Sequence, residues 1–142
     1  MKNLFKLSLL VLIVMMSCKT ENKNELEGAW KMVYAKWVFG DTLKYEFPGN
    51  LKIDQVKIWS GKYIVFAGPF TADTTKGNNY GWATYKLDGK KYREVYKGEK
   101  DSMVYKMVLE IRNDTLIQCW PADDNGNVDE KNLNIEKYVR LD

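Results

Sequence analysis

The stretch Glu27-Gly28-Ala29-Trp30-Lys31, EGAWK, stands where a polar segment gives way to alternating apolar and polar side chains. From Trp30 onward the alternation continues, and Trp30, Met32 and Tyr34 should lie on the same face of one extended segment. Alternation with a period of two residues is typical of a strand with one buried face. The sequence therefore predicts that the folded domain, residues 26–142, opens with a long strand.

The rest of the domain predicts further strands and no major helix. The chain has 142 residues and is rich in aromatic side chains, with five Trp, nine Tyr and five Phe, which favours sheets. Short apolar segments alternate with turn signals, and helical periodicity persists nowhere. We predict an all-β, antiparallel up-and-down barrel of eight to nine strands. The expected strands are 30–39, 42–47, 51–59, 62–67, 80–87, 91–97, 103–111, 115–120 and 133–141.

Three turns indicate how these strands pair. Ser60-Gly61, Asp88-Gly89 and Asn113-Asp114 each join two expected strands, and such residues tolerate positive φ in tight hairpins. Neighbouring strands should therefore pair in sequence order. Alternation then assigns an inward face to one set of residues in the run 103–111, namely Met103, Tyr105, Met107, Leu109 and Ile111.

Residues 1–17 have the pattern of a secretory leader. Lys2 and Lys6 precede an apolar run that ends at Ser17-Cys18, and this run is shorter than the roughly 20 residues that cross a bilayer as a helix. The segment Met15-Met16-Ser17-Cys18 resembles a bacterial lipobox, with Met15 where Leu is usual. The resemblance implies that Cys18 is lipidated; the alternative is ordinary signal cleavage, with Cys18 incidental.

A lipidated Cys18 would make this a membrane-anchored protein of the bacterial cell envelope, with the outer membrane as the expected location. Several acyl chains on one cysteine hold a protein stably, because each buried methylene contributes about 0.8 kcal/mol. Residues 18–25 are polar and should form a flexible tether between the membrane and the domain.

Charge and composition exclude several classes of function. Without Lys2 and Lys6, 20 of the 22 basic side chains remain against 19 acidic ones, so nucleic-acid binding does not follow from charge. The chain has no histidine, which excludes His-dependent catalysis and His-ligated metal sites. No spacing of acids, lysines and tyrosines indicates a catalytic pair. We therefore expect a non-enzymatic, monomeric protein with no cofactor and no metal.

Gly28 and Trp30 at the start of the first strand and Arg140 near the end of the last resemble the lipocalin superfamily. There the Gly permits a sharp bend, the Trp plugs the closed end of the barrel, and the Arg lies across the indole. The hairpins KIWSGKY (57–63) and NYGWATYKLDGKKY (79–92) are similar to those of lipocalin-like domains of unknown function in bacterial lipoproteins. The resemblance implies that Trp30 and Arg140 meet at the barrel floor.

Two classes of function remain open. The first is a barrel that binds a small hydrophobic or amphipathic molecule, with pocket residues on the expected inward faces. The second is an interaction module for a glycan or a protein partner, in which exposed aromatics form the contact surface. The expected pocket residues are Tyr63, Tyr85, Tyr105, Met107 and Cys119, and the surface candidates are Trp37, Phe39, Trp59, Trp82 and Trp120.

Overall fold

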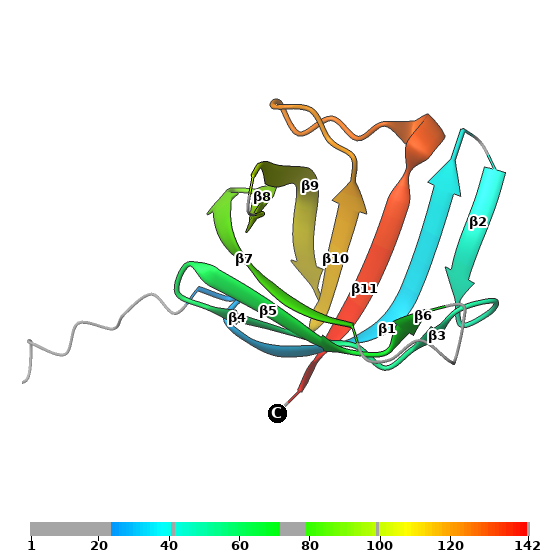
Figure 1. Ribbon diagram of the computed structural model, residues 1–142, viewed down its shortest axis with the longest axis horizontal. Helices are drawn as coiled ribbons and strands as arrows, with labels where there is room; N and C mark the ends of the chain where they lie inside the picture. The colour runs from blue at the N-terminus through cyan, green and yellow to red at the C-terminus, as the bar shows by residue number, and fades with distance from the viewer. Residues whose placement is uncertain (1–23, 41, 72–78, 99, 142) are drawn as a thin grey trace, which may run out of the picture.

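The computed structural model describes residues 24–40, 42–71, 79–98 and 100–141 (Figure 1). Within these residues, nine strands form one antiparallel sheet and two short strands form a separate ladder. Eight of the nine close into a barrel, because β11 pairs with β1 as well as with β10. The predicted all-β barrel is therefore confirmed. The expected leader, Cys18 and all of the tether before Asn24 lie outside the described residues.

The strands lie close to their expected positions. One difference is that the expected strand 51–59 is divided in two, and another is a short strand at Phe70–Thr71 that the sequence analysis did not predict. A single-turn 3₁₀ helix, η1, spans Glu130–Asn132, and no helix in the described part of the chain is long and apolar enough to cross a membrane. The strands are β1 (Gly28–Phe39), β2 (Thr42–Phe47), β3 (Lys52–Ile53), β4 (Val56–Ser60), β5 (Tyr63–Gly68), β6 (Phe70–Thr71), β7 (Asn79–Asp88), β8 (Lys91–Lys97), β9 (Ser102–Arg112), β10 (Thr115–Trp120) and β11 (Asn134–Leu141).

The barrel follows the order β1-β4-β5-β7-β8-β9-β10-β11 and returns to β1. The long strand β1 changes its partner along its length: residues 28–31 pair with β4, whereas residues 35–39 pair with β2. Strand β2 therefore extends the sheet beside the upper half of β1, at the right of Figure 1. The separate ladder pairs β3 with β6.

The three predicted tight turns are present. Gly61 and Gly89 adopt φ of 56° and 58° between paired strands, and Asn113 and Asp114 adopt φ of 49° and 58°. Positive φ is favourable for Gly and accessible to Asn and Asp. These turns confirm that the strands they join pair in sequence order.

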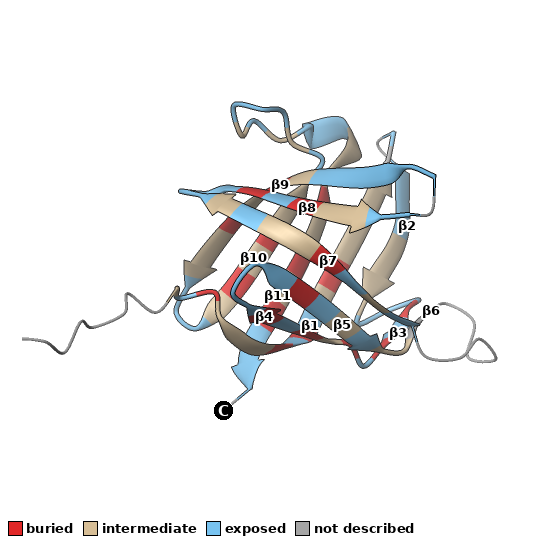
Figure 2. Cartoon of the chain, turned by 60° about the vertical axis from the view of Figure 1, so that its left-hand side comes forward, coloured by how far each residue is buried: buried red, intermediate tan, exposed pale blue. Residues whose placement is uncertain are grey.

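The core fills the closed end of the barrel. Buried residues, red in Figure 2, occur along the strands that form the barrel, and the largest buried side chains include Trp30, Trp59, Tyr92 and Tyr138. Tyr138 lies edge-on to Trp59, with ring centroids 6.1 Å apart. Close packing of large aromatics at this end leaves the free space of the barrel at the other end.

A bulge in β1 corrects one expected face. The register between β1 and β11 shifts between Met32 and Tyr34, so that Trp30, Met32 and Ala35 are buried. The Tyr34 ring instead lies under the Lys137 ammonium, 5.1 Å from its centroid, on the outer side of β11. The extra residue in a bulge moves all later side chains to the opposite face. The expectation that Tyr34 shares the face of Trp30 was therefore wrong.

Candidate ligand-binding site

The barrel floor brings together residues from the two ends of the domain. Trp30 in β1 and Arg140 in β11 are opposite each other in the ladder that closes the barrel, and the guanidinium carbon lies 4.3 Å from the centroid of the indole. Such an arrangement is a cation–π contact. The predicted meeting of Trp30 and Arg140 is confirmed.

Gly28 lets the chain pass beneath this arginine. Its φ is +128°, and a Cβ built there would lie 2.7 Å from Nη1 of Arg140. The guanidinium donates hydrogen bonds to the backbone oxygens of Glu27, at 2.7 Å, and Glu25. The indole N–H of Trp30 donates to the backbone oxygen of Leu26 at 2.9 Å. A side chain at position 28 would displace the arginine, so the floor requires glycine.

A cavity of about 710 Å³ occupies the barrel on the side away from the floor. Its lining comes from strand ends opposite the floor, including Trp37 late in β1, Trp120 at the end of β10 and Asn134 at the start of β11. Met103 and Tyr105 also line it, and both are exposed at this end. The volume falls within the roughly 300–1,000 Å³ typical of small-molecule sites.

Aromatic rings form much of the cavity wall. The rings of Trp37 and Trp120 meet edge to face with centroids 6.3 Å apart. The Tyr96 ring packs against the rings of Phe66 and Tyr105, with centroid distances of 6.1 and 5.6 Å. These side chains come from five different strands, so the wall surrounds the cavity. Interlocking rings of this kind hold one another in place and present an apolar surface.

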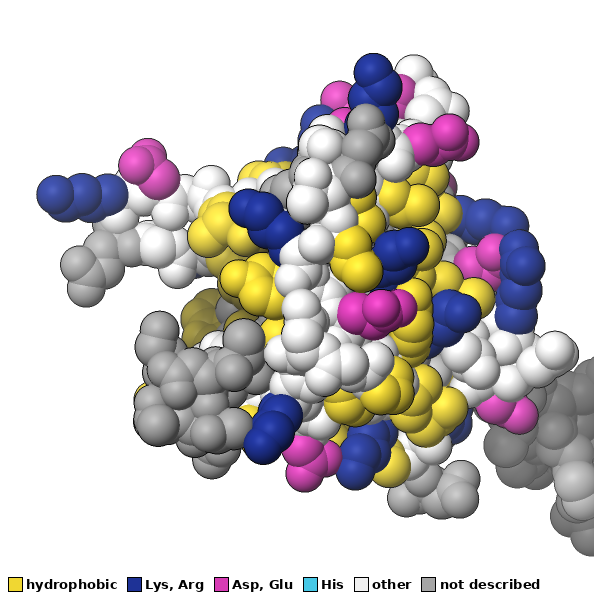
Figure 3. All heavy atoms as spheres, turned by 90° about the vertical axis from the view of Figure 1, so that its right-hand side faces the viewer, with side chains coloured by type: hydrophobic (Ala, Val, Ile, Leu, Met, Phe, Trp, Pro, Cys, Tyr) yellow, Lys and Arg dark blue, Asp and Glu magenta, His cyan; other side chains and the backbone are white. Residues whose placement is uncertain are grey.

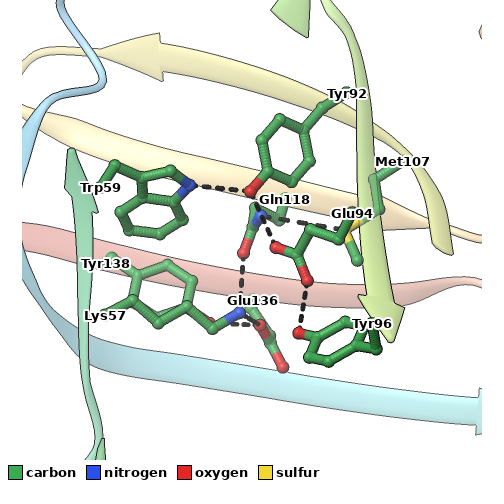
Figure 4. Close-up of polar contacts among 9 residues, drawn as sticks. All are labelled: Lys57, Trp59, Tyr92, Glu94, Tyr96, Met107, Gln118, Glu136 and Tyr138. Atoms are coloured by element: carbon green, nitrogen blue, oxygen red, sulfur yellow. Dashed lines mark hydrogen bonds and ion pairs between the residues drawn. The ribbon is translucent and has the colours of Figure 1, made fainter. Parts of the chain in front are cut away.

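The cavity base carries two buried carboxylates, and the first is Glu94 of β8 (Figure 4). Tyr92 and Tyr96 donate hydrogen bonds of 2.8 and 2.6 Å to its two oxygens, one hydroxyl to each. The Tyr92 oxygen in turn accepts the indole N–H of Trp59 at 2.7 Å. Glu94 is thus held by two neutral hydroxyl donors from its own strand, and Trp59 of β4 in turn holds one of these hydroxyls.

The second carboxylate is Glu136 of β11, which accepts hydrogen bonds from the Lys57 ammonium at 3.0 Å and from the Tyr138 hydroxyl. The same ammonium donates to Oε1 of Gln118 at 3.0 Å and lies 4.9 Å from the centroid of the Tyr138 ring. Figure 4 shows these groups beside the Glu94 cluster. Since Lys57 is opposite Trp30 in the ladder of β4 with β1, the polar groups lie directly above the floor.

The tyrosines of this base remain neutral over the physiological range. Burial is the main cause that raises the pKa of the Tyr92, Tyr96 and Tyr138 hydroxyls well above the ordinary value. The negative charge of Glu94 raises the pKa of Tyr92 and Tyr96 further, and that of Glu136 does the same for Tyr138. Each hydroxyl therefore keeps its proton and donates a hydrogen bond to a carboxylate.

The structure divides the five expected pocket residues. Tyr105 and Met107 line the cavity, and Tyr85 points inward but packs against Tyr92 below it, with ring centroids 5.7 Å apart. Tyr63 lies on the outer face of β5, where its ring meets that of Trp82 at 6.1 Å. Cys119 lies between the inward Gln118 and Trp120 and so faces outward. The expected inward orientation of Tyr63 and Cys119 was wrong by one residue of register.

The candidate surface aromatics also separate into groups. Trp59 is buried in the core, which removes it from the candidates for an exposed contact surface. Trp37 and Trp120 line the cavity, whereas Trp82 is exposed on the outer face of β7 and remains a surface candidate. The side chain of Phe39 lies outside what the structure describes.

The sequence analysis did not identify the polar base. Its signal was present, because Tyr92, Glu94 and Tyr96 alternate with the basic and exposed Lys91, Arg93 and Lys97. A basic outer face on this strand requires Glu94 to point inward beside two tyrosines. The contact of Lys57 with Glu136 has no comparable local signal, because their strands lie far apart in the sequence.

The outer wall carries an apolar row that crosses five strands. Ladder positions place Leu141, Ala29, Ile58, Val65 and Trp82 side by side on β11, β1, β4, β5 and β7. All but Ala29 are exposed. The side of the molecule with β2, by contrast, shows hydrophobic side chains next to charged ones (Figure 3).

The acidic loop before η1 satisfies its own carboxylates. Asp123 accepts hydrogen bonds from the backbone N–H groups of Asn125 and Asn127, at 2.9 and 2.8 Å, and the Asn127 side chain donates to it as well. These bonds hold the pKa of Asp123 below its ordinary value. Within the described ranges, three or more His, Cys, Asp or Glu side chains gather nowhere in an arrangement suited to a metal ion.

The amino-acid sequence was also compared with known proteins. No protein-family model matches the chain, and no curated protein matches it. The structure itself defines the class, an eight-stranded antiparallel barrel that is closed at one end by Trp30 and Arg140 and hollow at the other.

Proposed function

We propose that this protein is a lipid-anchored, lipocalin-like lipoprotein of the bacterial envelope that binds a small hydrophobic or amphipathic molecule in its barrel without catalysing a reaction. The cavity of about 710 Å³ carries this proposal. Its wall offers apolar contact to a ligand, and its base offers a few fixed polar groups, which is the usual composition of a small-molecule site.

The floor supports the lipocalin-like part of the proposal. Gly28, Trp30 and Arg140 occupy the positions that the resemblance implies, with the arginine across the indole at the closed end. A sealed floor limits the ligand to one route of access, through the end where Met103 and Tyr105 are exposed.

The ligand-binding part is tested with N-phenyl-1-naphthylamine, an uncharged apolar probe, and the full-length chain carrying Cys18→Ser, in which no lipid on Cys18 can compete for the cavity. We expect calorimetry to show one site. Met107→Trp places a larger side chain in the cavity and should weaken binding at least about 10-fold, because the lost contacts are those of several buried methylenes. Val65→Trp adds the same side chain to the outer wall and should leave binding unchanged.

Absence of probe binding by the Cys18→Ser chain would overturn this part of the proposal. Equal binding by Met107→Trp, with an unchanged near-ultraviolet circular dichroism spectrum, would place the probe elsewhere on the protein.

The anchor is tested separately by metabolic labelling with an acyl precursor in a bacterial host. Wild type should carry the label and partition with membranes, whereas Cys18→Ser should carry none. Equal labelling of both chains would refute lipidation at Cys18.

A second candidate function rests on the outer apolar row. Trp82 and its neighbours on β4 and β5 would serve as a contact surface for a glycan or a protein partner. The two functions are distinguished by Trp82→Ala, which should abolish partner binding in the interaction module and leave cavity binding of the probe unchanged.

A further inference from the structure

The cavity lining carries more acidic than basic side chains. Among the described residues of the lining, Glu94 and Glu136 are acidic and Lys57 alone is basic. All three are buried, with Glu94 only 1% exposed. Carboxylates in such surroundings are stabilised by a nearby positive charge, since water is excluded.

The one ammonium is already engaged. Lys57 donates to Glu136 and to Gln118, each at 3.0 Å, and its ammonium lies 4.9 Å from the centroid of the Tyr138 ring. Glu94 receives only the hydroxyl hydrogens of Tyr92 and Tyr96 among its described contacts. The excess of acidic groups in the cavity therefore lies at Glu94, which has hydrogen-bond donors but no ion-pair partner among the described residues.

Another group in the lining, the side-chain oxygen of Asn134, lacks a described hydrogen-bond donor. Oδ1 of Asn134 is buried, and no described residue donates a hydrogen bond to it. The side chain is more than nine-tenths buried, and its amide nitrogen donates to the backbone oxygens of Trp120 and Asn132 at 3.3 and 3.0 Å. These two bonds set the orientation of the amide, so the oxygen is the acceptor that remains.

The aromatic wall of the cavity favours a positively charged ligand. Trp37, Phe66, Tyr96, Tyr105 and Trp120 surround the space above the carboxylates. The faces of aromatic rings carry partial negative charge and attract organic cations. An anionic head group would meet these rings and Glu94 with no free cation to receive it.

We propose that the cavity selects a ligand with an apolar body and a protonated amine, and that the amine pairs with Glu94. This inference rests on the proposed binding function and adds the chemical class of the ligand. The amine supplies the positive charge that the cavity lacks and a hydrogen-bond donor of the kind that Oδ1 of Asn134 is missing, while the apolar body covers the aromatic wall.

The test uses decylamine, decanol and decanoate, which share one apolar chain and differ in the charge of the head group. Calorimetry is performed with the full-length Cys18→Ser chain near neutral pH, where a primary amine with a pKa of about 10.4 is protonated. We expect decylamine to bind at least about 10-fold more tightly than decanol, because hydrogen bonds to charged groups contribute more than neutral ones. Decanoate should bind more weakly than decanol.

Variants locate the effect. Glu94→Gln keeps the size of the side chain and an oxygen acceptor, and it should weaken decylamine binding about 10- to 100-fold while the affinity for decanol changes little. Glu110→Gln is the matched control, because it removes an equal charge from outside this cavity, where Glu110 pairs with Lys90 and Arg112.

The outcomes separate the two proposals. If none of the three compounds binds, the proposed binding function fails. If decanol or decanoate binds as tightly as decylamine, the barrel is a binding protein but the selection for amines is wrong. The comparison on the unmodified cavity decides this even if Glu94→Gln does not fold. Equal losses for Glu94→Gln and Glu110→Gln would also overturn the assignment to Glu94.

Discussion

Replacing Lys57 by Met should destabilise the fold far more than the same replacement at the surface. Lys57 and Glu136 form an ion pair of 3.0 Å with side chains only 9% and 6% exposed. Removing the ammonium leaves the buried Glu136 with the Tyr138 hydroxyl as its described hydrogen-bond donor. It also leaves Oε1 of Gln118 without a described donor. Loss of one partner of a buried ion pair costs about 3 to 5 kcal/mol.

Lys90→Met provides the matched control. Lys90 and Glu110 also form an ion pair, of 2.9 Å, but their side chains are 64% and 26% exposed. Surface pairs contribute about 0 to 1 kcal/mol, because water and salt screen them. The two substitutions thus remove the same group from pairs of nearly equal length, but the control pair is exposed and its Glu110 keeps the Arg112 guanidinium at 2.7 Å.

The assay is urea unfolding followed by far-ultraviolet circular dichroism, on full-length chains carrying Cys18→Ser. With an m-value of about 2 kcal/mol/M, Lys57→Met should lower the midpoint by about 2 M. The double variant Lys57→Met/Glu136→Gln removes both charges and should lose less stability than either single variant. Equal midpoints for Lys57→Met and Lys90→Met, or additive losses in the double variant, would refute the reasoning.

Two further predictions concern the floor and the outer surface. Trp30→Ala should lower the free energy of unfolding by about 3 to 5 kcal/mol in urea, because the indole is buried. Trp82→Ala, at an exposed position, should lower it by less than about 1 kcal/mol. An unchanged stability of Trp30→Ala would show that the floor does not stabilise the fold. Hydrogen bonds from Arg112 and Lys90 lower the pKa of Glu110 from 4.5 to about 2, so this carboxylate stabilises the fold above pH 4.5, and its contribution is lost as the pH falls through about 2. A carboxyl NMR titration should give that midpoint, and Arg112→Ala should raise it; an ordinary midpoint in wild type would contradict the ion pairs.

The strands and turns of this protein could be predicted from the sequence because their signals are local. Alternation, Gly61 and Gly89 at the turns, and the Asn113-Asp114 pair each depend on neighbouring residues alone. The floor was also predictable, although Trp30 and Arg140 lie far apart, because the resemblance supplied a contact that local patterns do not contain.

The assignment of side chains to inward or outward faces was wrong where neighbouring residues differ little in polarity or where a polar residue points inward. In β5 the residues Tyr63, Ile64, Val65 and Phe66 are all apolar, so alternation does not indicate which pair is buried. In β10 the polar Gln118 points inward beside the outward Cys119, the reverse of the usual pattern. A barrel with a polar base places polar side chains where a packed core would have apolar ones.

The sequence by itself determined an all-β chain with short hairpins, since backbone preferences and alternation act between near neighbours. Only the tertiary structure decided the bulge after Met32, which turns Tyr34 outward, and the approach of Lys57 to Glu136. Both depend on the register between strands far apart in the chain, which is set when the barrel closes. The cavity, with the buried Glu94 and its two tyrosine donors at the base, follows from that closure.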